Sequence, residues 1–279
     1  MCAAVGCFSL MDALLKTLSG SYPALQVASL RGLAAFPLVA AYVLWRGQVR
    51  GLLKVRWPLH LLRGVINIAM LALFAFALRE LGLAEAYTLF FIAPLLITAL
   101  STVVLGEKVR AAHWIAIAMG MVGVVVALRP NHEALLSMGA LAVLGAAAAY
   151  AVSAIAGRLL TRTDSSASLV FWTTSMLALG ASVLAWPQWI AVNPDHWPLV
   201  LGLGITGVLG QLTITEAFRN GQAAVVAPFE YTALAWGMGL DWVLWQSIPA
   251  AYTLLGGAII IASGIYLVRT ESTQPVLPP

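Results

Sequence analysis

The chain is a succession of long apolar segments separated by short polar ones. A helix that crosses a bilayer needs about 20 mostly apolar residues, and Gly, Pro and clustered charges mark where such segments begin and end. The connections are short, so we expect an all-helical integral membrane protein without a soluble domain. The sequence predicts ten membrane-spanning helices, at residues 3–20, 24–45, 59–79, 83–105, 111–128, 136–158, 168–186, 198–218, 222–245 and 250–268.

The composition supports a membrane location. Of the 279 residues, 61% are hydrophobic and 9% are charged, whereas about a quarter of the residues of an average soluble domain are charged. A chain with so few charged residues cannot cover a water-exposed surface of this size. We therefore take the bilayer as the solvent of this protein.

The basic residues predict the orientation, because Lys and Arg near span ends are enriched on the cytoplasmic side. With ten spans, both termini lie on one side, and ten of the fifteen basic residues fall there: Arg46, Arg50, Lys54, Arg56, Lys108, Arg110, Arg158, Arg162, Arg219 and Arg269. Only Arg79 and Arg129 fall on the opposite side, and the other three lie within spans. We expect both termini in the cytoplasm, and we attribute the net charge of +4 to topology rather than to nucleic-acid binding.

The two halves of the chain share landmarks in the same order. The segment "ALRELGLAEAYTLFFIAPLL" (77–96) precedes a span that ends in "LGEKV", and "AFRNGQAAVVAPFEYTALAW" (217–236) precedes one that ends in "LWQSIP". The offset corresponds to five spans, an odd number, so the second copy is inverted. Inverted repeats are typical of secondary transporters, which bind substrate near mid-bilayer between the repeats. We predict two inverted five-helix repeats, residues 1–134 and 135–279, around a central cavity.

These landmarks, with "MDALLK" (11–16), "SLRG" (29–32), "LLRG" (61–64) and "APFEYTALAWGMGLDWVLW" (227–245), resemble EamA-type carriers of the drug/metabolite transporter superfamily over nearly the whole chain. The resemblance implies a bacterial inner-membrane carrier that exports amino acids or related metabolites by alternating access, and it is nearest to aromatic amino-acid exporters of the YddG type. It implies no cofactor; the expected partners are a small-molecule substrate and lipid. Trp245-Gln246 stands where the family often repeats Gly-Glu.

Charged residues inside the predicted spans point to the cavity. A charge at mid-bilayer costs about 2.5–3.5 kcal/mol on insertion scales, so it is expected to face a partner and not lipid. Asp12 and Lys16 are four residues apart and share a helix face. Arg31 and Glu230 lie deep in the second and ninth spans. The four charges sum to zero, as either a compensated cluster at the cavity or local ion pairs that orient helices. Arg63 lies nearer the cytoplasmic end, where we expect its side chain to snorkel toward water.

Glu230 is the strongest candidate for substrate binding. It follows Pro228, whose missing N–H loosens the helix. Trp236, the one tryptophan away from the predicted span ends, lies beside the same helix face. An acid near an aromatic ring can hold an ammonium group and a flat side chain. The alternative is a carboxylate that is hydrogen-bonded for packing alone.

Other polar or aromatic residues at mid-membrane depth are candidate substrate contacts or satisfied packing groups: Asn67, Tyr87, Tyr150 and Gln211. Gln211 belongs to a stripe with Gly204 and Gly207, and such a stripe favours close helix packing over ligand contact. Pro94 and Pro228 each remove a backbone hydrogen bond at mid-span, so they are candidate hinges or static kinks.

Other classes of function find less support. An intramembrane enzyme needs reactive groups at bilayer depth, but there is no HExxH motif and the four histidines fall at span ends or in loops. Asp12 and Glu230 could form a carboxylate pair, but no known protease pattern surrounds them. The GxxxxGK[ST] loop of an ATP-driven pump is missing. A channel, a receptor, and a carrier of a nucleoside-type or vitamin metabolite stand as alternatives, and we expect no metal site.

Overall fold

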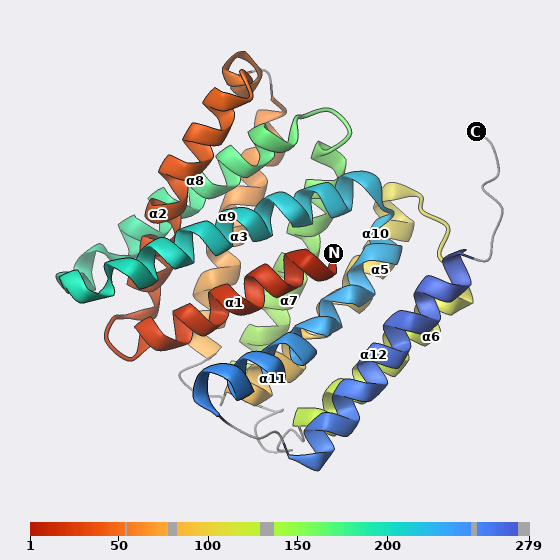
Figure 1. Ribbon diagram of the computed structural model, residues 1–279. Coiled ribbons are helices and arrows are strands. Elements are labelled where there is room, and N and C mark those ends of the chain that lie inside the picture. Colours follow the sequence, from red (N-terminus) through yellow and green to blue (C-terminus); the bar gives the residue numbers. More distant parts are fainter. Residues whose placement is uncertain (54, 78–82, 129–136, 247–249, 273–279) are drawn as a thin grey trace.

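The computed structural model describes residues 1–53, 55–77, 83–128, 137–246 and 250–272, and all regular structure in these ranges is helical (Figure 1). The first half contains α1 (Cys2–Ser19), α2 (Ala24–Trp45), η1 (Val49–Leu52), α3 (Trp57–Ala77), α4 (Leu83–Phe90), α5 (Ala93–Leu100), the π-helix η2 (Ser101–Leu105) and α6 (Ala111–Leu128). The second half contains α7 (Met138–Leu160), α8 (Ser166–Ala185), η4 (Trp186–Gln188), η5 (Pro194–His196), α9 (Trp197–Asn220), α10 (Ala223–Val226), η6 (Ala227–Tyr231), α11 (Thr232–Trp245) and α12 (Ala251–Ser272).

Eight segments of the described chain are long and apolar enough to cross a membrane: Cys2–Ser19, Leu25–Trp45, Trp57–Phe74, Ala86–Leu105, Met138–Leu160, Ser166–Gln188, Pro194–Asn220 and Ala251–Thr270. The fifth expected span is a shorter apolar helix, Ala111–Ala127. The ninth is divided into α10, η6 and α11 near Pro228, because proline lacks the N–H that continues a helix. The structure thus supports eight spans, and the count of ten stays a prediction.

The most extensive helix contacts join the two halves of the chain. α2 packs against α8 and α9, α3 against α7, α1 against α9, and α6 against α12. Figure 1 shows the α6–α12 pair along one side of the bundle. Large apolar side chains such as Val103, Leu179 and Val183 stay exposed on the outside, as expected of a surface that meets lipid. Because helices of the first half pack against helices of the second, residues of both halves line the space at the centre.

Glycines allow the closest of these helix approaches. A Cβ added to Gly32 of α2 would lie 2.6 Å from Cα of Ala178 in α8, and one added to Gly204 of α9 would lie 2.8 Å from Cβ of Ala34 in α2. The predicted packing role of the small-residue stripe therefore applies to Gly204. α2 can pack closely between α8 and α9 because glycine has only a hydrogen atom in place of a side chain at these contacts.

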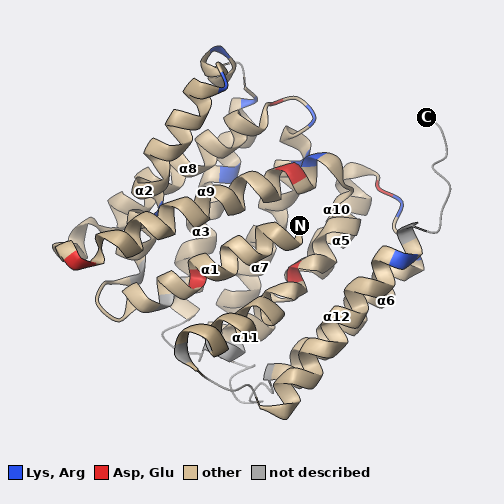
Figure 2. Ribbon diagram, viewed as in Figure 1, with Lys and Arg blue, Asp and Glu red and all other residues tan. Residues whose placement is uncertain are grey.

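Figure 2 shows most Lys and Arg residues at one end of the bundle, which we call the basic end. Nine of the ten basic residues predicted for one side of the membrane lie in described segments: Arg46, Arg50, Arg56, Lys108, Arg110, Arg158, Arg162, Arg219 and Arg269. Buried hydrogen bonds hold the loops there, for example His60 Nε2 with Asp164 Oδ2 at 2.9 Å. At the opposite end, Gln26 of α2 is fully buried and bonds both backbone groups of Ile190, at 2.5 and 2.9 Å. The distribution agrees with the predicted orientation, which itself stays a prediction.

Candidate substrate cavity

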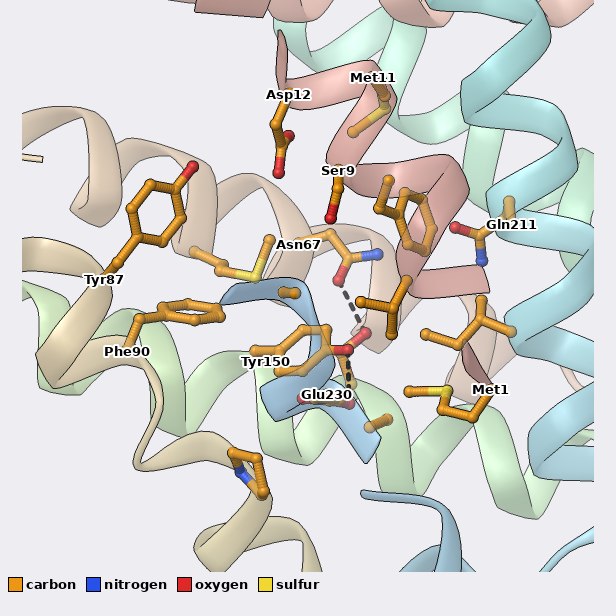
Figure 3. Close-up of a pocket in the computed structure, with 18 of the residues that line it drawn as sticks. Met1, Ser9, Met11, Asp12, Asn67, Tyr87, Phe90, Tyr150, Gln211 and Glu230 are labelled. Atoms are coloured by element: carbon orange, nitrogen blue, oxygen red, sulfur yellow. Dashed lines mark hydrogen bonds between the residues drawn. The ribbon is translucent and has the colours of Figure 1, made fainter. Parts of the chain in front are cut away.

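A cavity of about 720 Å³ lies within the bundle (Figure 3). This volume falls in the range of about 300–1,000 Å³ that is usual for small-molecule sites. Its walls come from α1 to α5 in the first half and mainly from α7, α8, α9, η6 and α11 in the second. A solute bound here would contact both halves of the chain.

Most residues that the sequence singles out line this cavity: Asp12, Arg31, Asn67, Tyr87, Pro94, Tyr150, Gln211 and Glu230. Each of the eight stands on a different helical element. Figure 3 shows the side chains of Asp12 and Tyr87 converging from α1 and α4. Pro228 is buried beside the site and does not line it, and the side chain of Lys16 lies outside the described residues.

Glu230 is held by Tyr150. The hydroxyl of Tyr150 donates a hydrogen bond of 2.9 Å to Oε1 of Glu230 (Figure 3). The 3-10 turn η6, which begins one residue before Pro228, brings the carboxylate of Glu230 to the cavity wall. Among the described residues, no basic nitrogen lies within 4.0 Å of this carboxylate. Glu230 therefore makes no direct ion pair with Arg31, the partner that would have neutralised it.

The structure contradicts the expectation that the side chain of Arg63 snorkels to the membrane surface. Its guanidinium lines the cavity, where Nε donates to Ser153 Oγ at 3.3 Å and Nη1 donates to Thr173 Oγ1 at 2.9 Å. Ser153 in turn donates to Oδ1 of Asn67 at 2.7 Å. Hydroxyl groups on α7 and α8 thus satisfy donors at this depth, so the side chain need not reach water.

The two Arg-Gly motifs explain why both arginines face inward. Gly32 and Gly64 pack against α8, as the close approach of an added Cβ to that helix shows in both cases. Successive residues of a helix are turned by about 100°, so pressing each glycine against α8 turns the preceding Arg31 or Arg63 into the cavity. The repetition of the motif in the sequence is the signal that could have placed Arg63 here.

Arg31 has no hydrogen-bond acceptor among the described residues. Its guanidinium carbon lies 5.9 Å from the centroid of the Phe8 ring, and Asp12 is the acid that attracts it electrostatically. No ion pair within 4.0 Å joins Arg31 to a described acid. A guanidinium has five N–H donors, and Arg31 is one of the residues that line the cavity.

The structure places Trp236 outside the cavity, contrary to its predicted role as the aromatic residue beside Glu230. It is absent from the cavity wall, its side chain is 46% exposed, and its ring lies against Gly6 of α1. α11 presents Leu234 and Gly237 to the cavity. Trp236, one step from Gly237, is turned away from the cavity by about 100°.

The aromatic surface near Glu230 is made instead by residues of α4 and α7. The rings of Phe90 and Tyr150 lie 5.6 Å apart between centroids and both line the cavity. Phe8 and Phe91 add further aromatic wall. Nothing in the sequence marks Phe8 or Phe90 as cavity residues, because the position of an aromatic residue on an apolar helix does not indicate the side that it faces.

At the basic end, segments of two broken helices pack against each other beside the cavity. α5 packs against α10 and η6, whereas α4 and α11 make no comparable contact within the described residues. α5 carries Pro94 in its first turn and η6 carries Pro228, so each break coincides with one of the predicted hinge prolines. In the described part of the chain, no group of three or more His, Cys, Asp or Glu residues could hold a metal ion.

A helical membrane bundle with a cavity between its two halves, lined mainly by apolar residues and by four charged side chains, has the architecture of a membrane transporter. The chain belongs to the EamA-like transporter family, whose model matches residues 1–129 and 137–270. The expected membership of the drug/metabolite transporter superfamily is thereby confirmed at the level of the family.

The relatives carry different solutes. The chain is 29% identical over 266 residues to the pseudopaline exporter CntI of Pseudomonas aeruginosa, covering 95% of this chain and 93% of the relative. It is 26% identical over 254 residues to a riboflavin transporter of Vibrio cholerae (90% and 85% covered) and 24% identical over 264 residues to an S-adenosylmethionine uptake transporter of Rickettsia prowazekii (94% and 89%). None of these three is named as an aromatic amino-acid exporter, so these relatives support the resemblance to the family and not the narrower one to aromatic amino-acid exporters.

A solved crystal structure has the same fold. It matches with a TM-score of 0.84 and 22% sequence identity, and the match covers 96% of this chain and 98% of the other chain. At this identity the likeness establishes the arrangement of the helices and not the solute.

Proposed function

We propose that this protein is a secondary transporter that moves a small amphoteric metabolite of the amino-acid type across the bacterial inner membrane by alternating access. The observation that carries the proposal is the central cavity, which gathers two acids, two guanidinium groups and several aromatic rings from both halves around one volume. The relatives named above differ in solute, so the family accommodates more than one cargo. A vitamin- or nucleoside-type metabolite is the second candidate, favoured by the aromatic wall and the riboflavin relative.

We also propose the full architecture of ten helices in two inverted repeats, residues 1–134 and 135–279, with cytoplasmic termini. The match of the family model to two successive stretches supports it. So does the breaking of a helix at Ile92-Ala93-Pro94 in the first half and at Val226-Ala227-Pro228 in the second. In this proposal the basic end faces the cytoplasm and Pro94 and Pro228 act as hinges, so movement of α5 relative to α10 and η6 opens the cavity to that side.

Within the cavity, Glu230 binds a protonated nitrogen of the cargo. The hydrogen bond from Tyr150 fixes the carboxylate, and the rings of Phe90 and Tyr150 provide a flat surface beside it. A charge-assisted contact contributes about 1.5–3 kcal/mol, which corresponds to about a tenfold to hundredfold change in affinity.

The test is counterflow in liposomes with labelled amino acids, amines and vitamins, using purified protein whose thermal stability is checked. Glu230→Gln keeps the shape and removes the charge, so the apparent KM for solutes with a protonated nitrogen should rise about tenfold to hundredfold. Tyr150→Phe is the matched control, because it removes the orienting bond and keeps the charge; its KM should rise less. A Glu230→Gln protein with unchanged KM for every transported solute would remove Glu230 from the site.

A further inference from the structure

Arg31 is the one cavity-lining guanidinium without a described hydrogen-bond acceptor, and it sits on α2 within a membrane span. A charged side chain at such depth requires a partner. The centroid of the Phe8 ring lies 5.9 Å from the guanidinium carbon, and Asp12 attracts the guanidinium without forming an ion pair within 4.0 Å. Arg63 differs, because hydroxyl groups of the protein occupy its Nε and Nη1 donors.

We propose that Arg31 binds a carboxylate of the cargo, so that the transported solute carries at least one carboxylate. Guanidinium and carboxylate match as a bidentate pair, and such charge-assisted bonds are about twice as strong as neutral ones. A carboxylate fits better than a phosphate dianion, because Asp12 lines the same cavity and would repel a second negative charge. The described charged residues of the wall are Asp12, Arg31, Arg63 and Glu230, which are balanced, and a zwitterion preserves that balance. This inference rests on the proposed transport function.

The experiment is thermal stabilisation of the purified protein by a fixed panel of probes: the common amino acids, their carboxamides, the matching amines, citrate, succinate and phenyl phosphate. Carboxylates should stabilise the wild type, and their carboxamides should bind at least tenfold more weakly. Arg31→Gln should abolish this preference, whereas Arg31→Lys, which keeps the charge and loses the fork, should retain part of it. The double variant Asp12→Asn, Arg31→Gln separates the two roles, because it restores charge balance without restoring the carboxylate site.

The outcomes are decisive in both directions. Recovery of carboxylate binding in the double variant would mean that Arg31 only balances Asp12. Equal binding of carboxamides, preferential binding of phenyl phosphate, or a panel in which no carboxylate stabilises the wild type would overturn the inference. Transport of amines by a protein that ignores carboxylates would leave its role as a secondary transporter intact, but it would remove both the amphoteric class of cargo and the role of Arg31.

Glu107 at the basic end makes contacts that join the first half of the chain to the second. Gly106, in the left-handed conformation with φ 68°, ends η2 and turns the chain so that Glu107 points into the second half. Oε1 and Oε2 of Glu107 accept the backbone N–H groups of Ala223 and Ala224 at 3.1 and 3.2 Å. Arg158 of α7 lies 3.6 Å from Oε1, and its side chain also donates to carbonyls at the end of α9. The side chain of Glu107 is only 6% exposed.

The second half does not repeat this arrangement. Gln246 has φ 51°, a left-handed conformation like that of Gly106. By this criterion Gln246 corresponds to Gly106, one residue later than in the match of Trp245-Gln246 with Gly106-Glu107 that the sequence suggests. The side chain of Gln246 bonds Val243 of its own helix. Neither Gln246 nor the next residue in the sequence, Ser247, is an acid. In an inverted repeat, the corresponding contact would close the opposite end, and here it would lack a carboxylate.

We infer that Glu107 latches the basic end closed and biases the transporter toward the conformation open at the opposite end. The carboxylate joins the end of one broken helix to the start of the other, where α5, α10 and η6 meet. Opening the basic end must break both bonds to α10, and the corresponding positions of the second half, Gln246 and Ser247, carry no carboxylate in the sequence that could form equal bonds. The equilibrium between the two conformations therefore favours closure at the basic end.

Cysteine labelling tests the latch. With Cys2 and Cys7 replaced by serine, single cysteines at Thr161, which lines the cavity near the basic end and is buried, and at Thr253, near the other end, report access to a maleimide. Glu107→Gln should raise the labelling rate at position 161 about tenfold and lower the rate at position 253. Glu216→Gln is the matched control, because Glu216 is exposed at the same end and, among the described side chains, accepts a hydrogen bond only from Asn220 of its own helix. Unchanged rates, or rates that rise at both positions as the protein loosens, would refute the latch.

Discussion

The glycine contacts of α2 give a prediction whose size and sign follow from the geometry. A Cβ at position 32 would lie 2.6 Å from Cα, 2.9 Å from Cβ and 3.0 Å from N of Ala178. Carbon atoms in ordinary contact are about 3.5–4.0 Å apart, so α2 and α8 would have to separate by about 1 Å. Backbone atoms cannot rotate aside as a flexible side chain can. We therefore expect Gly32→Ala to approach the upper end of the overpacking cost, about 3 kcal/mol.

Alanine also recovers about 1 kcal/mol of helix propensity relative to glycine, so the net loss for Gly32→Ala is about 2 kcal/mol. Gly239 in α11 is the matched control, because a Cβ added there meets nothing within 4 Å. Gly239→Ala should therefore gain about 1 kcal/mol. For a chain of this size, 1 kcal/mol corresponds to about 2–4 °C in Tm, so the two variants should shift in opposite directions, down by about 4–8 °C and up by about 2–4 °C.

The assay is thermal unfolding of both purified variants in one detergent, followed by transport in liposomes. Because Gly32 adjoins Arg31, a displaced α2 should also raise KM in Gly32→Ala and leave it unchanged in Gly239→Ala. If Gly32→Ala were as stable as the wild type, the close approach of α2 and α8 would not hold in the protein, and the explanation of why Arg31 faces the cavity would fail with it.

Three further predictions follow from the same structure. A reporter that is active only outside the cytoplasm should be silent when fused after residue 50 or 162 and active after residue 192, and activity at residue 50 would invert the topology. Trp236→Leu should leave the KM for aromatic and aliphatic solutes unchanged, because the ring lies outside the cavity; a selective loss for aromatic solutes would return Trp236 to the site. Gln26→Leu should lower the unfolding free energy by about 1–2 kcal/mol, because two buried hydrogen bonds to Ile190 are lost, and a thermal scan showing no loss would contradict this.

The sequence alone determined the features that depend on local composition. Apolar length predicted the positions of the helices, because crossing a bilayer demands about 20 apolar residues wherever they lie in the chain. The cost of burying charge predicted that Asp12, Lys16, Arg31 and Glu230 would form either a compensated cluster at the cavity or local ion pairs that orient helices. Asp12, Arg31 and Glu230 line the cavity. Internal similarity pointed to Pro94 and Pro228 as candidate hinges or static kinks, and each of them coincides with a break in a helix.

Only the tertiary structure decided which way side chains on apolar helices face and which partners they find. Arg63 points inward because Ser153 and Thr173, from distant parts of the chain, accept its donors. Trp236 points outward because Gly237 occupies the inner face of the same turn. Glu230 bonds Tyr150 rather than Arg31, and these residues lie on separate helices. A membrane helix is apolar on most of its circumference, so hydrophobic periodicity does not distinguish the side that faces lipid from the side that faces the cavity, and helix packing supplies that information.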